Sequence, residues 1–222
     1  MPKGRLEAFS DGVIAIIITI MVLEIATPAG PRPADLAPLW TSFFSYALSF
    51  FSVGAYWNNH HHLLNLVDKV SGRMLWANLF FLFVLSFVPV ATDWIDKTSF
   101  AAFPTMVYIL LNIVVSLAYM LLETVVRRSH RTVANGIKAE LDEMTPRQAA
   151  LIKRRSTFKE RWTIGFELAA LVLALAMPGT RLAYAALILA YGPWIIPDLR
   201  IVHVLDWLAE EEESAEVSQS DE

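Results

Sequence analysis

Residues 5–25 join charged and polar side chains to an apolar run, and this combination restricts the fold more than any other segment. The segment reads RLEAFSDGVIAIIITIMVLEI, and between Gly12 and Leu23 its only polar side chain is Thr19. With the residues before it, the run is long enough to predict a helix that crosses a bilayer. A carboxylate near the start of such a helix is costly in hydrocarbon, so we expect Asp11 to have a partner inside the fold and a role in function.

The rest of the chain repeats this apolar character in separate segments. Of its 222 residues 55% are hydrophobic, above the range of about 45–50% that is usual for soluble domains. About 20 apolar residues suffice to cross a bilayer as a helix. We therefore predict an all-α, polytopic membrane protein with six transmembrane helices, at about residues 8–25, 36–66, 74–92, 100–126, 162–177 and 182–196.

The placement of lysine and arginine supports an even number of spans. All of the 18 basic residues except Arg32, Lys97 and Arg181 fall at the chain ends or in the even-numbered connections. Cytoplasmic segments carry the excess of lysine and arginine, so both termini are expected in the cytoplasm. Residues 1–205 then form one transmembrane domain with a basic cytoplasmic loop at about 127–161, in which Pro146 predicts a helix start. Residues 206–222 form an acidic tail whose composition predicts disorder.

The residue inventory also excludes several classes of function. There is no cysteine, so disulfides and thiolate sites are excluded. His60, His61 and His62 are adjacent, and consecutive residues of a helix point in different directions, so the three cannot share one metal ion. No nucleophile–base–orienter set is evident. We expect no enzymatic activity, no metal site, no cofactor and no nucleic-acid partner.

The pattern Arg5-x-x-x-Phe9-Ser10-Asp11 resembles the signature of the transmembrane protein 175 family of potassium channels. The resemblance continues into the second predicted span and covers the six-span layout over about residues 3–205. It implies a homotetramer in a prokaryotic cell membrane, with potassium ions passing through a pore lined by the first helix of each subunit. We expect a scaffolding role, without contact to the ion, for a polar group that includes the aromatic motif residue Phe9; its members are Arg5, Phe9, Ser10, Asp11, Trp57, Asn58, His60 and His61.

One face of the first helix is the candidate pore wall. Ile16, Thr19, Ile20 and Leu23 stand at i, i+3, i+4 and i+7, so they share a face. The resemblance implies that Ile16 and Leu23 form apolar constrictions and that Thr19 forms a layer of hydroxyls. Apolar rings gate by dewetting, and oxygen ligands can replace an ion's hydration shell. Without the motif, the residues alone favour a helix whose isoleucines mostly face lipid or neighbouring helices.

These observations predict a potassium-selective cation leak channel with passive permeation through a homotetrameric pore and a hydrophobic constriction. The alternative is a proton-coupled secondary transporter, in which Asp11 and a histidine relay protons. Transporters of that kind usually show inverted repeats and broken helices with charges at the bilayer midplane, and neither is evident in the sequence. As partners of Asp11 we expect the Trp57 indole, Asn58, Asn59 or the histidines of the second span, whereas Arg5 is free to reach the membrane interface.

Overall fold

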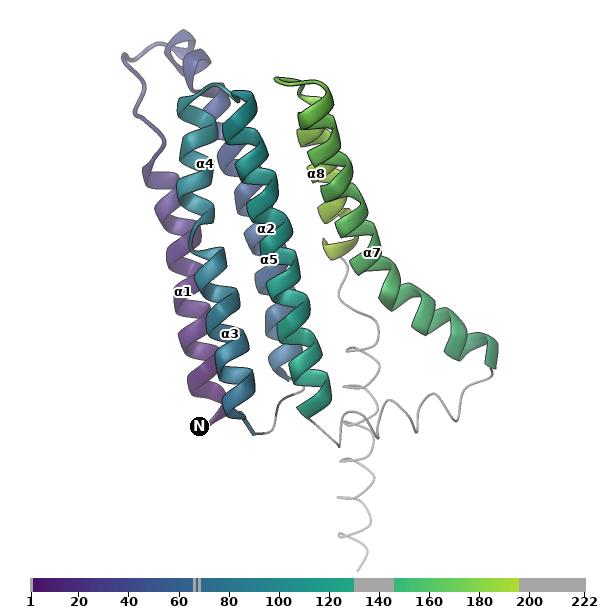
Figure 1. Ribbon diagram of the computed structural model, residues 1–222. Coiled ribbons are helices and arrows are strands. Elements are labelled where there is room, and N and C mark those ends of the chain that lie inside the picture. The colour runs from purple at the N-terminus through teal and green to yellow at the C-terminus, as the bar shows by residue number, and fades with distance from the viewer. Residues whose placement is uncertain (1, 66, 68, 130–145, 196–222) are drawn as a thin grey trace, which may run out of the picture.

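The computed structural model describes residues 2–65, 67, 69–129 and 146–195, and these residues form helices joined by short turns (Figure 1). Within these ranges the prediction of an all-α fold is confirmed, because no strand occurs in them. The elements, in order, are α1 (Lys3–Leu23), η1 (Pro33–Leu39), α2 (Trp40–Asn65), α3 (Gly72–Leu85), α4 (Val88–Lys97), α5 (Ala102–Ser129), α7 (Pro146–Ala176), α8 (Leu182–Tyr191) and η2 (Gly192–Ile195).

Four helical segments among the described residues are long and apolar enough to cross a membrane. They are Lys3–Leu23, Pro33–Asn65, Gly72–Lys97 and Ala102–Arg128, and they overlap the first four predicted spans. The fifth predicted span falls on the C-terminal half of α7, and the sixth on the shorter apolar segment Leu182–Trp194. The count of six spans therefore stays a prediction.

The second and third of these segments are not uniform helices. Residues 33–39 form the 3₁₀ helix η1, so the α-helix of the second segment begins only at Trp40. The third segment is divided into α3 and α4, which Figure 1 shows stacked end to end. Pro89 lies in the first turn of α4, where it has no N–H to donate to the preceding turn. Just before it, Phe87 N donates to Val84 O at 3.2 Å and the Ser86 hydroxyl donates to Phe83 O at 2.7 Å. The regular helix pattern is interrupted here, and one apolar run becomes two helices.

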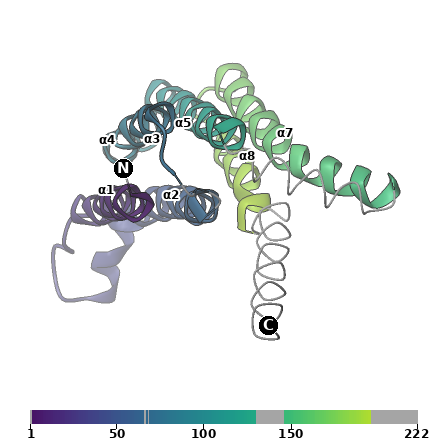
Figure 2. The same ribbon diagram turned by 90° about the horizontal axis from the view of Figure 1, so that it is seen from below.

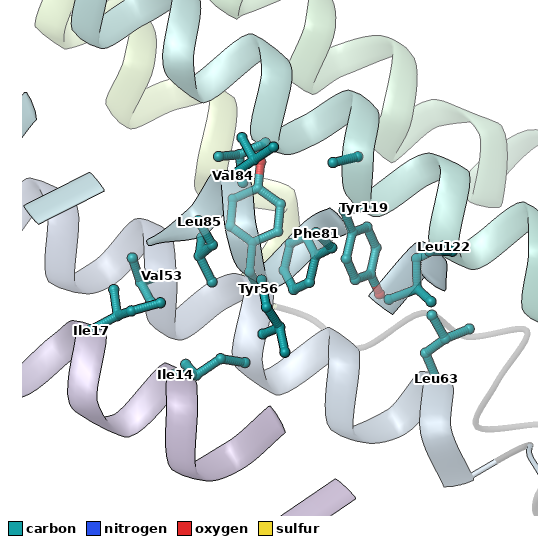
Figure 3. Packing of buried hydrophobic residues seen from close by; sticks show 14 of the residues in the cluster. Ile14, Ile17, Val53, Tyr56, Leu63, Phe81, Val84, Leu85, Tyr119 and Leu122 are labelled. Carbon is teal, nitrogen blue, oxygen red and sulfur yellow. The ribbon is translucent and has the colours of Figure 1, made fainter. Parts of the chain in front are cut away.

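The helices surround a core that is rich in aromatic side chains. Tyr56 of α2, Phe81 of α3 and Tyr119 of α5 contact one another, with ring centroids 5.6–5.9 Å apart (Figure 3). Ile14 and Ile17 pack against this core from α1. Viewed from below, α7 and α8 lie beyond α5 on the side away from α1 (Figure 2). As a result α1 stands at the edge of the bundle, with one side uncovered.

The helix connections fall at two opposite ends of the bundle (Figure 1). The turns after α1, α4 and α7 meet at one end, which holds Arg32, Lys97 and Arg181. The N-terminus, the turn between α2 and α3, and the C-terminal end of α5 lie at the other end. That end carries Lys3, Arg5, Lys69, Arg73, Arg127 and Arg128.

Some predicted features lie outside the described residues. They are the acidic tail 206–222, the middle of the basic loop at 130–145, and the last residue of two predicted spans, Leu66 and Ile196. On either side of residues 130–145, α5 continues to Ser129 and α7 begins at Pro146.

Candidate functional site

The α1 helix has one face buried in the protomer and one face open. Ile14, Ile17 and Met21 are buried against the neighbouring helices, with no more than 4% of each side chain exposed. The predicted pore-wall residues lie on the opposite side, where Ile16 is 58% exposed and Leu23 is 80% exposed. Thr19 and Ile20 are exposed on the same side. A continuous open face of this kind, on a helix at the edge of the bundle, is available to lipid or to other copies of the chain.

Thr19 presents an oxygen with free lone pairs on this face. Its hydroxyl lies 2.9 Å from Ala15 O and 3.1 Å from Ile16 O, so its proton is directed back to the helix backbone. A hydroxyl group has one donor hydrogen and two acceptor lone pairs. Because the hydroxyl hydrogen is directed to the helix backbone, the lone pairs of the Thr19 oxygen are directed away from the helix and are available to a cation.

Asp11 is held by α2. The Trp57 indole Nε1 donates a hydrogen bond of 3.0 Å to Asp11 Oδ1, which is one of the pairings that the sequence predicts. The Trp57 ring also stacks on His61, with centroids 6.3 Å apart. A charge-assisted hydrogen bond is stronger than a neutral one, so this contact fixes α1 against α2 just before the apolar run begins.

Ser10 is held by α3, through a directed chain of hydrogen bonds. His60 Nε2 lies 2.7 Å from Asn78 Oδ1, and Asn78 Nδ2 donates to Ser10 Oγ at 2.9 Å. The Ser10 hydroxyl in turn donates a hydrogen bond to Leu6 O at 2.8 Å. Since Asn78 Oδ1 only accepts, His60 carries its proton on Nε2. All three polar side chains are buried, so the chain joins α1, α2 and α3 in the interior.

His61 has a partner that the sequence does not indicate. Its Nδ1 lies 3.3 Å from Glu7 Oε1, and its Nε2 is 3.4 Å from Asn65 Nδ2. Of the partners expected for Asp11, the structure therefore selects Trp57 and not the histidines: His61 faces Glu7, and His60 reaches Ser10 only through Asn78. Glu7 lies one turn before Asp11 on the same helix, but nothing in the sequence pairs it with a histidine of α2.

Three members of the predicted polar group do not enter these contacts. Phe9 is 50% exposed and Arg5 is exposed. Asn58 is partly exposed, and its side chain forms no hydrogen bond with the residues that the structure describes. Its neighbour Asn59 is buried instead and donates to Ala55 O at 2.8 Å and to Trp194 O at 3.2 Å, which ties α2 to η2.

A second polar network lies deeper in the bundle and away from α1. The Ser116 hydroxyl of α5 donates to Glu167 Oε1 of α7 at 2.7 Å, and Tyr56 OH lies 2.7 Å from Ser116 Oγ. Nearby, Tyr191 OH donates to Asn112 Oδ1 at 2.6 Å. Glu167 is fully buried. Polar pairs of this kind hold helices together inside a membrane, so this network attaches α7 and α8 to the rest of the bundle.

Comparison with known proteins relates this arrangement to a family. The family model described as endosomal/lysosomal potassium channel TMEM175 matches residues 5–89, which include the α1 motif and both of its supporting helices. A protein of Chryseobacterium sp. (strain P1-3) named as a potassium channel is 43% identical over 201 residues, which cover 90% of this chain and 96% of that protein. The human endosomal/lysosomal proton channel TMEM175 is 33% identical over 103 residues, but these cover only 20% of that protein.

A solved structure shares the fold. It is the crystal structure of a lysosomal potassium-selective channel TMEM175 homolog from Chamaesiphon minutus, with a TM-score of 0.62 and 23% sequence identity. The likeness covers 87% of this chain and 94% of that one. The family and the relatives compared are ion channels and not enzymes. The chain is therefore a membrane protein that belongs to the TMEM175 family of ion channels.

Proposed function

We propose that this protein is a potassium-selective leak channel, formed by four copies of the chain whose α1 helices surround a common axis. The observation that carries the proposal is the open face of α1. Ile16 and Leu23 are more than half exposed in the protomer, whereas Ile14 and Ile17 on the other face are buried. Around a shared axis, these exposed side chains become the wall of the passage.

Physical chemistry assigns each of the four residues a part. Rings of Ile16 and Leu23 leave a narrow apolar passage that holds water poorly, so an ion crosses it only after losing part of its hydration shell. Thr19 lies between the two rings and offers lone pairs to the partly dehydrated cation. Potassium is larger than sodium and more weakly hydrated, so it loses water more readily. Ile20 lies beside Ile16 on the same face and completes the apolar part of the pore wall.

The names of relatives support the choice of ion. The Chryseobacterium relative is named as a potassium channel, and the identity extends over nearly its whole length. Proteins of this similarity and coverage usually share an architecture, which makes potassium the permeant ion to test first. The animal relatives are named as proton channels, so proton flux is measured beside it. No cofactor is proposed.

The orientation follows from the two ends of the bundle. The end with the N-terminus carries several lysines and arginines, and the opposite end has only Arg32, Lys97 and Arg181 among the described residues. By the preference of basic residues for the cytoplasmic side, we place the N-terminus and the turn between α2 and α3 in the cytoplasm. The membrane is the cell membrane of a prokaryote.

Flux through reconstituted liposomes tests the proposal. The wild-type protein is expected to pass potassium faster than sodium, driven by the ion gradient alone. Ile16→Ala and Ile16→Asn widen or hydrate the constriction, so both are expected to raise conductance and weaken selectivity. Leu175→Ala on α7 alters an equally exposed residue away from α1 and is the matched control. If both Ile16 variants conduct as the wild type does, α1 does not line the passage.

The same liposomes separate a channel from a proton-coupled transporter. A leak channel gives a flux that rises with the potassium gradient and needs no proton gradient. A transporter gives a saturable flux that stops when the proton gradient is removed. Native mass spectrometry of the purified protein gives the number of subunits, which we expect to be four.

A further inference from the structure

A cavity of about 350 Å³ lies far from the α1 motif, between α2, the turn after α4 and α8. Its main lining residues are Trp40, Phe44, Phe100, Arg181, Tyr184 and Ile188. The volume lies within the range of about 300–1,000 Å³ that is usual for small-molecule sites. All of these elements meet at the end of the bundle that holds the turns after α1, α4 and α7 (Figure 1).

The floor of the cavity is a fixed cluster of three aromatic rings. Phe44, Phe100 and Tyr184 contact one another edge to face, with centroids 5.0–6.2 Å apart. The Tyr184 hydroxyl is bonded to Thr105 Oγ1 at 2.6 Å, which fixes its ring. The wall is more open, since Trp40 is 69% exposed and Ile188 is 50% exposed. The cavity thus has an apolar floor held by ring contacts and a hydrogen bond, and a wall of exposed side chains.

Phe100 occupies this floor at a cost to the backbone. Its φ is +62°, and that of Ser99 before it is +49°. Non-glycine residues with positive φ are uncommon, and a bulky side chain makes the conformation less favourable still. Phe100 N donates to Ile95 O at 2.8 Å, which holds the turn closed. Strain of this kind persists where the surrounding structure requires it and is concentrated at binding sites.

Arg181 gives the apolar cavity a charged edge. At this end of the bundle Arg32 pairs with Asp35 at 3.3 Å, and Lys97 pairs with Asp93 at 2.7 Å. Arg181 is exposed and has no carboxylate within ion-pair distance in the part of the chain that the structure describes. An arginine beside an apolar surface suits a phosphate group, which it can bind through two parallel hydrogen bonds.

We propose that this cavity binds a phospholipid of the leaflet that surrounds this end of the bundle. The phosphate binds Arg181, and an acyl chain lies over the aromatic floor and against Ile188. Trp40 marks the level of the headgroups, where exposed tryptophans of membrane proteins gather. The site is separate from the open face of α1, so the proposal goes beyond the proposed function and does not depend on which ion passes.

Native mass spectrometry of the delipidated full-length protein, titrated with phosphatidylglycerol, tests the proposal. Arg181→Gln removes the charge and is expected to weaken the tightest lipid-binding step about tenfold, as the loss of a charge-assisted hydrogen bond does. Ala185→Trp places a ring in the cavity from an exposed position on its wall and is expected to abolish that step. Arg32→Gln, at the same end but outside the cavity, is the matched control and is expected to bind as the wild type does.

Two further probes separate the headgroup from the chain. Diacylglycerol has the acyl chains without the phosphate, and inorganic phosphate has the anion without the chains, so neither is expected to displace bound phosphatidylglycerol at equal concentration. The proposal is overturned if Arg181→Gln binds phosphatidylglycerol as tightly as Arg32→Gln, or if Ala185→Trp leaves the step intact. It is overturned equally if inorganic phosphate displaces the lipid, since that result indicates a simple anion site.

Discussion

Trp57 Nε1 donates a hydrogen bond of 3.0 Å to Asp11 Oδ1, and in this way α2 holds the residue that stands just before the apolar run of α1. The preceding residue, Ser10, points to a different helix and accepts a hydrogen bond of 2.9 Å from Asn78 of α3. Consecutive residues of a helix point in different directions. One short motif therefore fixes α1 against two neighbours, which sets the rotation of α1 about its axis and the direction of its open face.

The Trp57–Asp11 contact is expected to contribute modestly to stability. Trp57→Phe keeps an aromatic ring beside His61 but removes the indole N–H. Because Trp57 is 43% exposed, we expect a loss of about 1 kcal/mol, below the range of about 1.5–3 kcal/mol that is usual for hydrogen bonds to charged groups. Thermal unfolding in detergent measures it. In Asp11→Asn the indole still has an oxygen to donate to, so this variant is expected to lose less. A Trp57→Phe protein as stable as the wild type would mean that the bond is not formed.

Asn78 is expected to matter far more than a similar residue outside the network. Asn78→Leu removes the bridge and leaves the buried His60 Nε2–H without an acceptor. Leaving buried polar groups unpaired costs roughly 2–4 kcal/mol here. Asn58→Leu, on the partly exposed side of α2, is the matched control and is expected to change stability by less than about 0.5 kcal/mol. Equal melting temperatures for the two variants would rule out the buried chain of hydrogen bonds.

Gly12 allows a test of assembly that leaves the protomer intact. It lies on the open side of α1, and a Cβ at this position meets nothing within 4 Å in the protomer. Gly12→Leu is therefore expected to fold but to disturb the packing of α1 helices against one another, since small residues permit close helix contact in membranes. Size-exclusion chromatography with light scattering is expected to show smaller assemblies. Gly165→Leu on α7, equally unobstructed, is expected to keep the wild-type size. If both variants keep that size, α1 is not at the subunit interface.

Thr19 is expected to affect selectivity more than rate. Thr19→Val has nearly the same shape but no hydroxyl, so a dehydrated cation loses one oxygen contact from each subunit. If the four lost contacts together lower the preference for potassium over sodium by about 1 kcal/mol, the size of one ordinary hydrogen bond, the selectivity falls roughly fivefold, measured from reversal potentials. Thr19→Ser restores the oxygen and is expected to restore most of the preference. A Thr19→Val channel with unchanged reversal potentials would exclude the hydroxyl from ion contact.

Local features of the fold could be predicted from the sequence. The apolar segments of the sequence predict the positions of α1, α2, α5 and the combined α3 and α4. Hydropathy depends only on residues that are adjacent in the sequence, so no knowledge of the tertiary structure is needed. The division between α3 and α4 was not predicted, because the apolar run continues across Ser86 and Phe87. Pro89 is its signal in the sequence, but a proline in an apolar run can also kink a helix without dividing it, and the hydrogen bonds of the turn show which occurs.

In the candidate site, the open face of α1 could be predicted from the sequence, but most contacts between helices could not. The spacing of Ile16, Thr19, Ile20 and Leu23 is enough to place them on one face, because helix geometry is regular. The partner of Asp11 was among several candidates, and only the packing of α2 selects Trp57. The roles of Asn78 and Glu7 depend on contacts between distant parts of the chain, such as the one that joins Ser10 to Asn78. No periodic pattern encodes such contacts.

The exposure of Ile16 to the water of an ion pathway is the most direct test of the proposed function. The chain has no cysteine, so Ile16→Cys places a single thiol on the open face of α1, and Val172→Cys places one on the equally exposed surface of α7. Potassium current is recorded in planar bilayers while a charged, membrane-impermeant thiol reagent is added. We predict that the current through Ile16→Cys channels is blocked and that the current through Val172→Cys channels is unchanged. If the reagent leaves the current through Ile16→Cys channels unchanged as well, that result contradicts the assignment of α1 as the pore wall.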